Sequence, residues 1–252
     1  MKLALLGHGR MAHAFEAHAA AAGHEVGAVL TSRHAADAAR LLAGHDVAID
    51  FSVPGAVLAH VEACAAAAVP LVEGTTGWQA QETAVRQVVA ERRAAVVYGA
   101  NFSIGVNVFY RIVTRAAELL RGLDAYAPFI EEAHHAMKRD APSGTALVLK
   151  DILARESGRG DVPVASARAG HIPGTHRVGF DSAGDQILLT HTARSRETFA
   201  AGALLAAYWI AAPRGRGRAG MYAFTDVLDD VLAPCQHTWP DVGGGSSRTE
   251  RE

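Results

Sequence analysis

The sequence predicts an α/β protein with two domains, a doubly wound parallel sheet and a second α+β unit with a mixed or antiparallel sheet. Three observations support this class. A glycine-containing turn near the N-terminus joins a short apolar run to an alanine-rich helical stretch. Up to residue 103, runs of strand length alternate with segments of helical spacing, which is typical of parallel β-α-β units. Beyond residue 103, one long helical stretch precedes strand-like runs separated by glycines.

Composition limits the possible functions. The chain has 252 residues, enough for two domains, half of them apolar and with a formal net charge of -2. This charge predicts no nucleic-acid partner, and no apolar run reaches the roughly 20 residues of a membrane span. Cys64 and Cys235 lie far apart without metal-binding spacing, and no signal segment precedes the first strand. We therefore expect a cytoplasmic protein with no membrane partner.

The first element is a buried strand at residues 2–6, followed at once by a glycine turn and a helix that stops near Gly23. In this context the turn matches the dinucleotide-binding pattern of a Rossmann-type domain. Gly7 permits the tight turn, Gly9 lets the backbone approach a pyrophosphate, and Ala12 lets the helix pack on the strand. The residues predicted to contact the cofactor here are Gly7, His8, Gly9, Arg10 and Met11.

The end of the second strand, residues 27–30, bears on the choice of cofactor. An acidic residue at this position binds the ribose hydroxyls of NAD, whereas a basic residue accommodates the extra phosphate of NADP. The chain has Ser32 and Arg33 there, and no carboxylate until Asp37. We therefore predict a preference for NADPH, with NADH as the alternative if Arg33 is only a solvated loop charge.

Strands and helices continue to alternate up to residue 103. We expect strands at 46–51, 70–73 and 95–98, with helices opening near residue 54 and spanning about 79–92. Ligands of such sheets lie beyond the carboxyl ends of the strands. The hydroxyls, amide and glycines expected at that edge are Ser52, Gly74, Thr75, Thr76, Gly99, Ala100, Asn101 and Phe102. All but Ser52 are predicted to bind the cofactor.

Residues 104–213 are predicted to form the second domain, for substrate binding and oligomerisation. Its expected helices are at 104–120, after Ser143 and at 198–210, and its strands at 126–130, 164–168, 176–180 and 186–191, the last three alternating like antiparallel strands. One uncovered sheet face would favour self-association. Residues 1–103 and about 214–235, with a short helix near 226–232, form the dinucleotide-binding domain, and 236–252 are expected to be disordered.

The run from Glu131 to Ala146 carries the candidate chemistry. His134, His135 and Lys138 follow a predicted strand, and a helix begins at about Ser143, so Gly144 and Thr145 lie in its first turn. Free N–H groups there favour a carboxylate or phosphate. This conjunction suits an anionic substrate that must take up a proton. Adjacent histidines on a strand point to opposite faces, which argues against a shared zinc ion.

This run, with residues 74–77 and 101–107, resembles the 4-hydroxy-tetrahydrodipicolinate reductase family of the lysine/diaminopimelate route. The similarity continues through 174–178, 190–196 and 199–204, and ends near residue 233. It implies an NAD(P)H-dependent reductase, usually a homotetramer, without flavin or metal. It also implies that His134 is the general acid/base and Lys138 the second catalytic residue. The residues predicted to hold the substrate's carboxylates are His135, Lys138, Ser143, Gly144 and Thr145.

The sequence departs from the family pattern at the compact first turn and at Ala12, where glycine is common. Two other functions stay open. Another oxidoreductase acting on amino acids, such as an aspartate or homoserine dehydrogenase, would share the first domain but not the run ending at Thr145. A nucleotide-sensing protein without turnover would have no need of His134 or Lys138.

Overall fold

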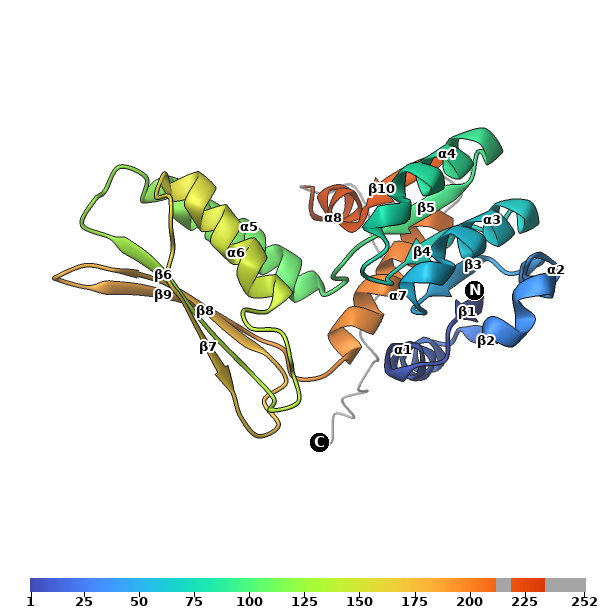
Figure 1. The fold of residues 1–252 in the computed structure, drawn as a ribbon, viewed down its shortest axis with the longest axis horizontal. Helices are drawn as coiled ribbons and strands as arrows, with labels where there is room; N and C mark the ends of the chain where they lie inside the picture. The colour runs from blue at the N-terminus through green and yellow to red at the C-terminus, as the bar shows by residue number, and fades with distance from the viewer. Residues whose placement is uncertain (212–218, 234–252) are drawn as a thin grey trace, which may run out of the picture. The chain divides into compact units, whose positions relative to one another are not determined.

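The computed structural model describes residues 1–211 and 219–233, which form two compact units (Figure 1). The first unit comprises Met1–Ser103 and the chain from Phe199 onward, and the second comprises Ile104–Thr198. Among the described residues, no helix combines the length and the apolar character needed to cross a membrane.

The first unit contains a six-stranded parallel sheet in the order β10-β5-β4-β3-β1-β2. Its strands are β1 (Lys2–Leu6), β2 (Glu25–Leu30), β3 (Val47–Asp50), β4 (Leu71–Glu73), β5 (Ala95–Tyr98) and β10 (Gly220–Ala223). Its helices are α1 (Arg10–Ala21), α2 (Ala38–Leu42), α3 (Val57–Ala67), α4 (Glu82–Arg92), α7 (Glu197–Ala211) and α8 (Phe224–Leu232), with short 3-10 helices η1 (Ser32–Asp37), η2 (Pro54–Ala56) and η3 (Gln79–Gln81). This architecture confirms the predicted doubly wound fold.

Both faces of this sheet are apolar because its strands are covered on both sides. Ala4, Leu6 and Leu71 pack with apolar residues of α2, α3 and α4, whereas Leu3 and Leu5 point to the opposite face. Figure 1 shows α3 and α4 on one side of the sheet and α1 and α7 on the other. The burial of nearly all of α7 explains why its sequence is apolar on every side.

The strand order reverses at β1, which lies between β2 and β3. Ligands of open α/β sheets bind beyond the carboxyl ends of the strands at such a switch point. Here that point is bordered by the turn after Leu6 and by the segment after Asp50. The topology therefore predicts a ligand site beside Gly7–Gly9 and residues 51–53.

The second unit has a four-stranded mixed sheet in the order β7-β6-β8-β9, with α5 (Ile104–Leu119) and α6 (Gly144–Ser157) against one face (Figure 1). The strands are β6 (Ala127–His134), β7 (Val164–Arg168), β8 (Thr175–Asp181) and β9 (Gln186–Thr192). Alternation along β6 turns Ile130, Glu132 and His134 towards the helices. Phe109, Leu149 and Val178 belong to the core on that face.

Two expectations for the second unit are wrong. The strand at 164–168 does not form an antiparallel hairpin with the next strand, because β7 pairs parallel with β6. Helix α6 lies between β6 and β7 and makes the crossover that a parallel pair requires. Only β6 with β8 and β8 with β9 are antiparallel. The helix at 198–210 belongs, from Phe199, to the first unit rather than to residues 104–213, and Gly202 lies directly against the carbonyl of Phe102.

Strand β10 was not predicted, although residues 214–235 were expected to return to the first domain. Its four residues are too few to show a periodicity, and their place is set by parallel pairing with β5. The predicted disorder of residues 236–252 lies outside the described residues.

Candidate active site

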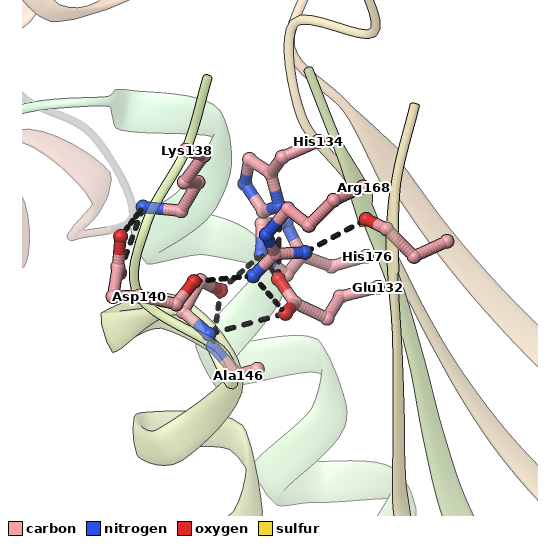
Figure 2. Close-up of polar contacts among 9 residues, drawn as sticks. Glu132, His134, Lys138, Asp140, Ala146, Arg168 and His176 are labelled. Carbon is pink, nitrogen blue, oxygen red and sulfur yellow. Dashed lines mark hydrogen bonds and ion pairs between the residues drawn. The ribbon is translucent and has the colours of Figure 1, made fainter. Parts of the chain in front are cut away.

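A buried polar cluster lies on the helix-covered face of the second sheet. Glu132 and His134 are two positions apart on β6 and therefore point to the same side. Arg168 on β7 is the register partner of His134, and His176 on β8 is the partner of Glu132. Figure 2 shows these four side chains converging near the start of α6. Strand alternation and sheet register therefore bring these four side chains together on one face of the sheet.

The Glu132 carboxylate is fully buried and lies at the centre of these contacts. Its Oε1 accepts a hydrogen bond from Arg168 Nη2 at 2.6 Å and from the Ser143 N–H at 3.2 Å. Its Oε2 lies 2.9 Å from His134 Nδ1 and 3.8 Å from His176 Nε2. The His134 and His176 rings meet edge to face, with their centroids 5.0 Å apart. The carboxylate thus places an anion against both imidazoles.

All three pKa values are lowered in this cluster, which favours the charged form of Glu132 and the neutral form of the two histidines. Burial alone would raise the pKa of Glu132, but hydrogen bonds from Ser166, Ser143 and Arg168 lower it to about 2, so the carboxyl is ionised. Burial lowers the pKa of His134, and the nearby Glu132 charge opposes this shift. Burial and the neighbouring His134 lower the pKa of His176 to about 4. His176 is therefore neutral near pH 7, and the charges of Glu132 and, less strongly, Asp140 favour a proton on His134.

Lys138 lies on the loop that follows β6 in the sequence. Its Nζ donates to both carboxylate oxygens of Asp140 at 2.8 Å, which lowers the pKa of Asp140. Asp140 is exposed, and the Lys138 side chain is largely buried. An incoming carboxylate that binds Lys138 therefore has to compete with Asp140 for the ammonium.

The start of α6 lies beside the same loop. Ser143 is the N-cap: its hydroxyl accepts from the Ala146 N–H at 3.2 Å and lies 3.1 Å from His176 Nε2. The Ser143 side chain therefore caps α6, and its predicted substrate contact stays a prediction. Gly144 is exposed and Thr145 half-buried, and their first-turn N–H groups have no acceptor inside the helix. His135 is half-buried, just past the end of β6.

Two groups of side chains in the described part of the chain bring potential metal ligands together. His8, His13 and Glu16 form an exposed group, and Glu132, His134 and His176 a buried one, each with its ligand atoms within 4.8 Å of one another. In the buried group the Arg168 guanidinium already neutralises the only carboxylate. A second cation there is disfavoured by charge, so this cluster is better suited to handling a proton.

The dinucleotide turn has the geometry that its glycines require. Gly7 has φ +97°, and a Cβ at this position would lie 2.6 Å from the carbonyl oxygen of Phe51. Gly9 is the N-cap of α1, and a Cβ there would meet nothing within 4 Å, so the backbone is open to an approaching phosphate. The turn and the free helix start fit the pyrophosphate of a dinucleotide.

The other residues predicted at this edge differ in exposure. The exposed ones are His8, Arg10, Thr76 and Ala100, and Ser32 and Arg33 are exposed on η1. Met11, Gly74, Gly99 and Asn101 are half-buried. The ring of Phe102 is buried against Phe224, with the centroids 4.7 Å apart. Its side chain therefore belongs to the core and leaves only its backbone for a ligand.

Beneath the edge, Asp50 and Glu73 form a buried carboxylate pair on adjacent strands. Asp50 Oδ1 accepts from the Ser52 N–H at 2.8 Å and from the Thr75 hydroxyl at 3.2 Å, and its Oδ2 lies 2.6 Å from His60 Nδ1. Glu73 Oε1 accepts from the Thr75 N–H at 2.7 Å. Burial and the Asp50 charge raise the pKa of Glu73 to about 9. This pair ties the loops after β3 and β4 together, and it uses the side chain of Thr75 to do so.

A glycine turn of dinucleotide-binding type at the switch point of a parallel sheet, together with a separate unit that holds a buried imidazole, is typical of a dinucleotide-dependent oxidoreductase. The chain belongs to the dihydrodipicolinate reductase family. Residues 1–102 match the model "Dihydrodipicolinate reductase, N-terminus", and residues 105–228 match "Dihydrodipicolinate reductase, C-terminus". This confirms the family resemblance and the NAD(P)H-dependent oxidoreductase class.

Two relatives and a solved structure agree with this family. The chain is 36% identical to the 4-hydroxy-tetrahydrodipicolinate reductase of Christiangramia forsetii over 246 residues, covering 92% of this chain and 99% of that protein. It is 42% identical to the enzyme of the same name from Thiobacillus denitrificans, covering 74% of each. A dipicolinate-bound dihydrodipicolinate reductase from Paenisporosarcina sp. TG-14 superposes with a TM-score of 0.72 at 18% identity, covering 88% of this chain and 97% of that one. At this identity the superposition supports the fold.

No role was predicted from the sequence for Glu132, Arg168, Asp50 or Glu73. A signal for Glu132 was available, because it precedes His134 by two positions and strand alternation places both on one face. Arg168 could not be found in this way, since its position depends on the parallel pairing of β7 with β6.

Proposed function

We propose that the chain catalyses the NAD(P)H-dependent reduction of 4-hydroxy-tetrahydrodipicolinate, via dihydrodipicolinate, to tetrahydrodipicolinate in lysine/diaminopimelate biosynthesis. The observation that carries the proposal is the buried Glu132–His134 contact beside Lys138 and the start of α6, in a chain of this family. The combination offers a proton donor and an anion-binding site together, which suits a cyclic dicarboxylate.

The residues of the second unit supply proton transfer and anchoring. Bound NAD(P)H supplies a hydride to the conjugated imine of the substrate, which leaves an enamine-like anion. An imidazolium at His134 donates the proton that this anion needs. Lys138 anchors a carboxylate and stabilises the developing negative charge. Gly144 and Thr145 hold a carboxylate through their first-turn N–H groups, and the half-buried His135 is a further contact.

For the first unit we propose that the cofactor lies at the carboxyl edge of the parallel sheet. Gly7–Met11 would bind the pyrophosphate, and residues 74–76 and 99–102 the nicotinamide side, with Thr75 and Phe102 contributing backbone only. Arg33 and Ser32, exposed after β2, favour NADPH because their position suits the extra phosphate.

We further propose that the uncovered face of the second sheet is a homotetramer interface. Leu188 is about half exposed there, and Ala165 and Ala167 are also exposed. Burying such a face requires another copy of the chain, because α5 and α6 cover only the opposite one.

The experiment is to follow oxidation of NADPH and of NADH by the purified protein while the preceding synthase generates the substrate. We expect loss of nicotinamide absorbance that requires both proteins, and faster with NADPH. Absence of turnover with NADPH still bound would instead support a sensor or a different substrate.

A further inference from the structure

We propose that Glu132 is a positioning residue for the reaction. Held by Arg168, its carboxylate fixes the His134 ring so that Nδ1 faces Glu132 and Nε2 faces the substrate. The inference rests on the proposed function, because it takes His134 as the proton donor.

The contacts of Glu132 leave its carboxylate little freedom. Arg168 Nη2 and the Ser143 N–H occupy Oε1, and Arg168 is itself anchored by donating to the carbonyls of Asp140 at 2.6 Å and Ala167 at 2.8 Å. Rotation of the carboxyl would break both contacts on Oε1. Arg168 therefore determines where Oε2 lies.

Oε2 and His134 Nδ1 are each other's polar neighbours. Both atoms are buried, neither has a conventional hydrogen-bond partner among the described residues, and they lie 2.9 Å apart. A buried polar atom without a partner is costly, and a small rotation of the imidazole that points a proton on Nδ1 at Oε2 satisfies both atoms. His176 cannot take this place, because its Nε2 lies 3.8 Å from Oε2 and is engaged with the Ser143 hydroxyl.

Gly174 keeps space beside the other ring nitrogen. A Cβ on this residue would lie 3.2 Å from His134 Nε2 and 3.3 Å from Cδ2. Because glycine has no side chain, the Nε2 edge of the ring is not covered from that position. The two edges of the imidazole thus differ: one faces a fixed anion, and the other lies beside a residue without a side chain.

This arrangement fits the proton balance of the reaction. The imidazolium gives its Nε2 proton to the enamine-like anion left by hydride addition, at a different carbon from the one that received the hydride, so one hydride and one proton are consumed. The ring is then neutral with its remaining proton on Nδ1, the tautomer that Glu132 stabilises. Glu132 therefore stabilises both the imidazolium before proton transfer and the neutral, Nδ1-protonated ring after it.

Burial lowers the pKa of His134 most, and the charges facing the ring modify this shift. Glu132 on its own strand and Asp140 on the following loop favour the imidazolium, whereas Lys138 on that loop and Arg168 on β7 disfavour it. His176 on β8 is neutral near pH 7. Among these charged groups, Glu132 acts most strongly on His134. Replacing the Glu132 charge by a neutral group leaves mainly the charges of Lys138 and Arg168, which disfavour the imidazolium. The substitution should therefore lower the His134 pKa.

The first test does not depend on turnover. Imidazole ¹⁵N signals of His134 are titrated by NMR in wild-type protein, Glu132→Gln and Glu118→Gln, the last removing an exposed Glu–Arg pair in the same unit. We expect Glu132→Gln to lower the His134 pKa by about one unit or more and Glu118→Gln to leave it unchanged. An unchanged His134 pKa in Glu132→Gln would overturn the inference.

The second test measures kcat against pH with saturating cofactor. Turnover falls as pH rises through the pKa of a general acid, so Glu132→Gln should move this fall to lower pH. Its kcat near pH 7.5 should drop at least about tenfold, less than the 10²- to 10⁴-fold typical of losing the acid itself, with little change in NADPH affinity. A wild-type pH profile in Glu132→Gln would refute positioning. A wild-type enzyme inactive on this substrate would instead refute the proposed function.

A second variant, Glu132→Asp, keeps the inference testable if Glu132→Gln does not fold. It keeps the charge beside Arg168 but withdraws the carboxylate by one methylene. We expect a folded protein with an ionic partner for Arg168, a reduced kcat and an altered His134 ¹⁵N signal. A folded Glu132→Asp with wild-type kcat and signal would show that the position of the carboxylate does not matter and would overturn the inference.

Discussion

Glu73→Gln gives a quantitative test of the carboxylate pair beneath the cofactor edge. Burial and the charge of Asp50 raise the pKa of Glu73 to about 9 in the folded protein, against 4.5 when exposed. At neutral pH the carboxyl is therefore protonated in the folded chain and ionised in the unfolded one. The stability that Glu73 contributes is fully present below about pH 4.5, and it is lost as pH rises towards about 9.

The magnitude follows from the two pKa values. At pH 7.5, about three units above the unfolded value, the linkage lowers the free energy of unfolding by at most about 4 kcal/mol. Glutamine stays neutral at every pH and can donate to Asp50 as the protonated acid does. For a chain of this size each kcal/mol moves Tm by about 2–4 °C. Glu73→Gln should therefore raise Tm by several degrees.

The assay is thermal unfolding at about pH 5, 6.5 and 8. Glu62→Gln serves as the control, since Glu62 is exposed on α3 in the same unit. We expect the Tm difference between Glu73→Gln and wild type to grow with pH, and the control to show no such trend. A Glu73→Gln protein no more stable than wild type at pH 8, or a difference independent of pH, would refute the reasoning.

Three further predictions concern activity. His134→Gln should reduce kcat by about 10²- to 10⁴-fold with unchanged NADPH affinity by fluorescence titration, and near-normal turnover would exclude His134 as the acid. Gly174→Ala introduces a Cβ 3.2 Å from His134 Nε2 at φ +155° and should reduce kcat at least about tenfold. Gly184→Ala, where a Cβ meets nothing within 4 Å, is its control, and equal kcat values would contradict this reading. Arg33→Ala should weaken NADPH binding about tenfold while sparing NADH, whereas Arg40→Ala should change neither; equal losses for both cofactors would reject a phosphate contact.

Local sequence signals predicted the first unit best. The turn after Leu6 required glycine for a reason that the structure bears out, since Gly7 combines a positive φ with close contact to Phe51. The short strand β10 had no comparable signal, because pairing with β5 rather than its own composition places it in the sheet.

The second unit was harder to predict because its pairing depends on distant segments. The spacing of strands at 164–168 and 176–180 resembled a meander, yet α6 allows the first of them to pair parallel with β6. Helix α7 was placed with the wrong unit, since an entirely apolar helix carries no information about which sheet covers it.

In the candidate site, too, residues that are close in sequence were predicted and residues brought together by strand pairing were not. His134, Lys138 and the helix start at Ser143 are neighbours in sequence, so one short segment predicted them. Arg168 and His176 reach the cluster only through sheet register and were not assigned a role. The side chains of Ser143 and Thr75, predicted as ligand contacts, cap α6 and donate to Asp50 in the structure, and their contacts with a ligand stay predictions.

The central claim is that this chain transfers a hydride to the synthase product and then protonates it from His134. The most direct measurement uses NADPH deuterated at the transferred position, with the synthase present, and identifies the product by mass spectrometry. We expect tetrahydrodipicolinate carrying one deuterium, formed in proportion to nicotinamide oxidised and nearly absent with His134→Gln. Nicotinamide oxidation without deuterium in the product, or a His134→Gln protein that forms it at the wild-type rate, would contradict the account.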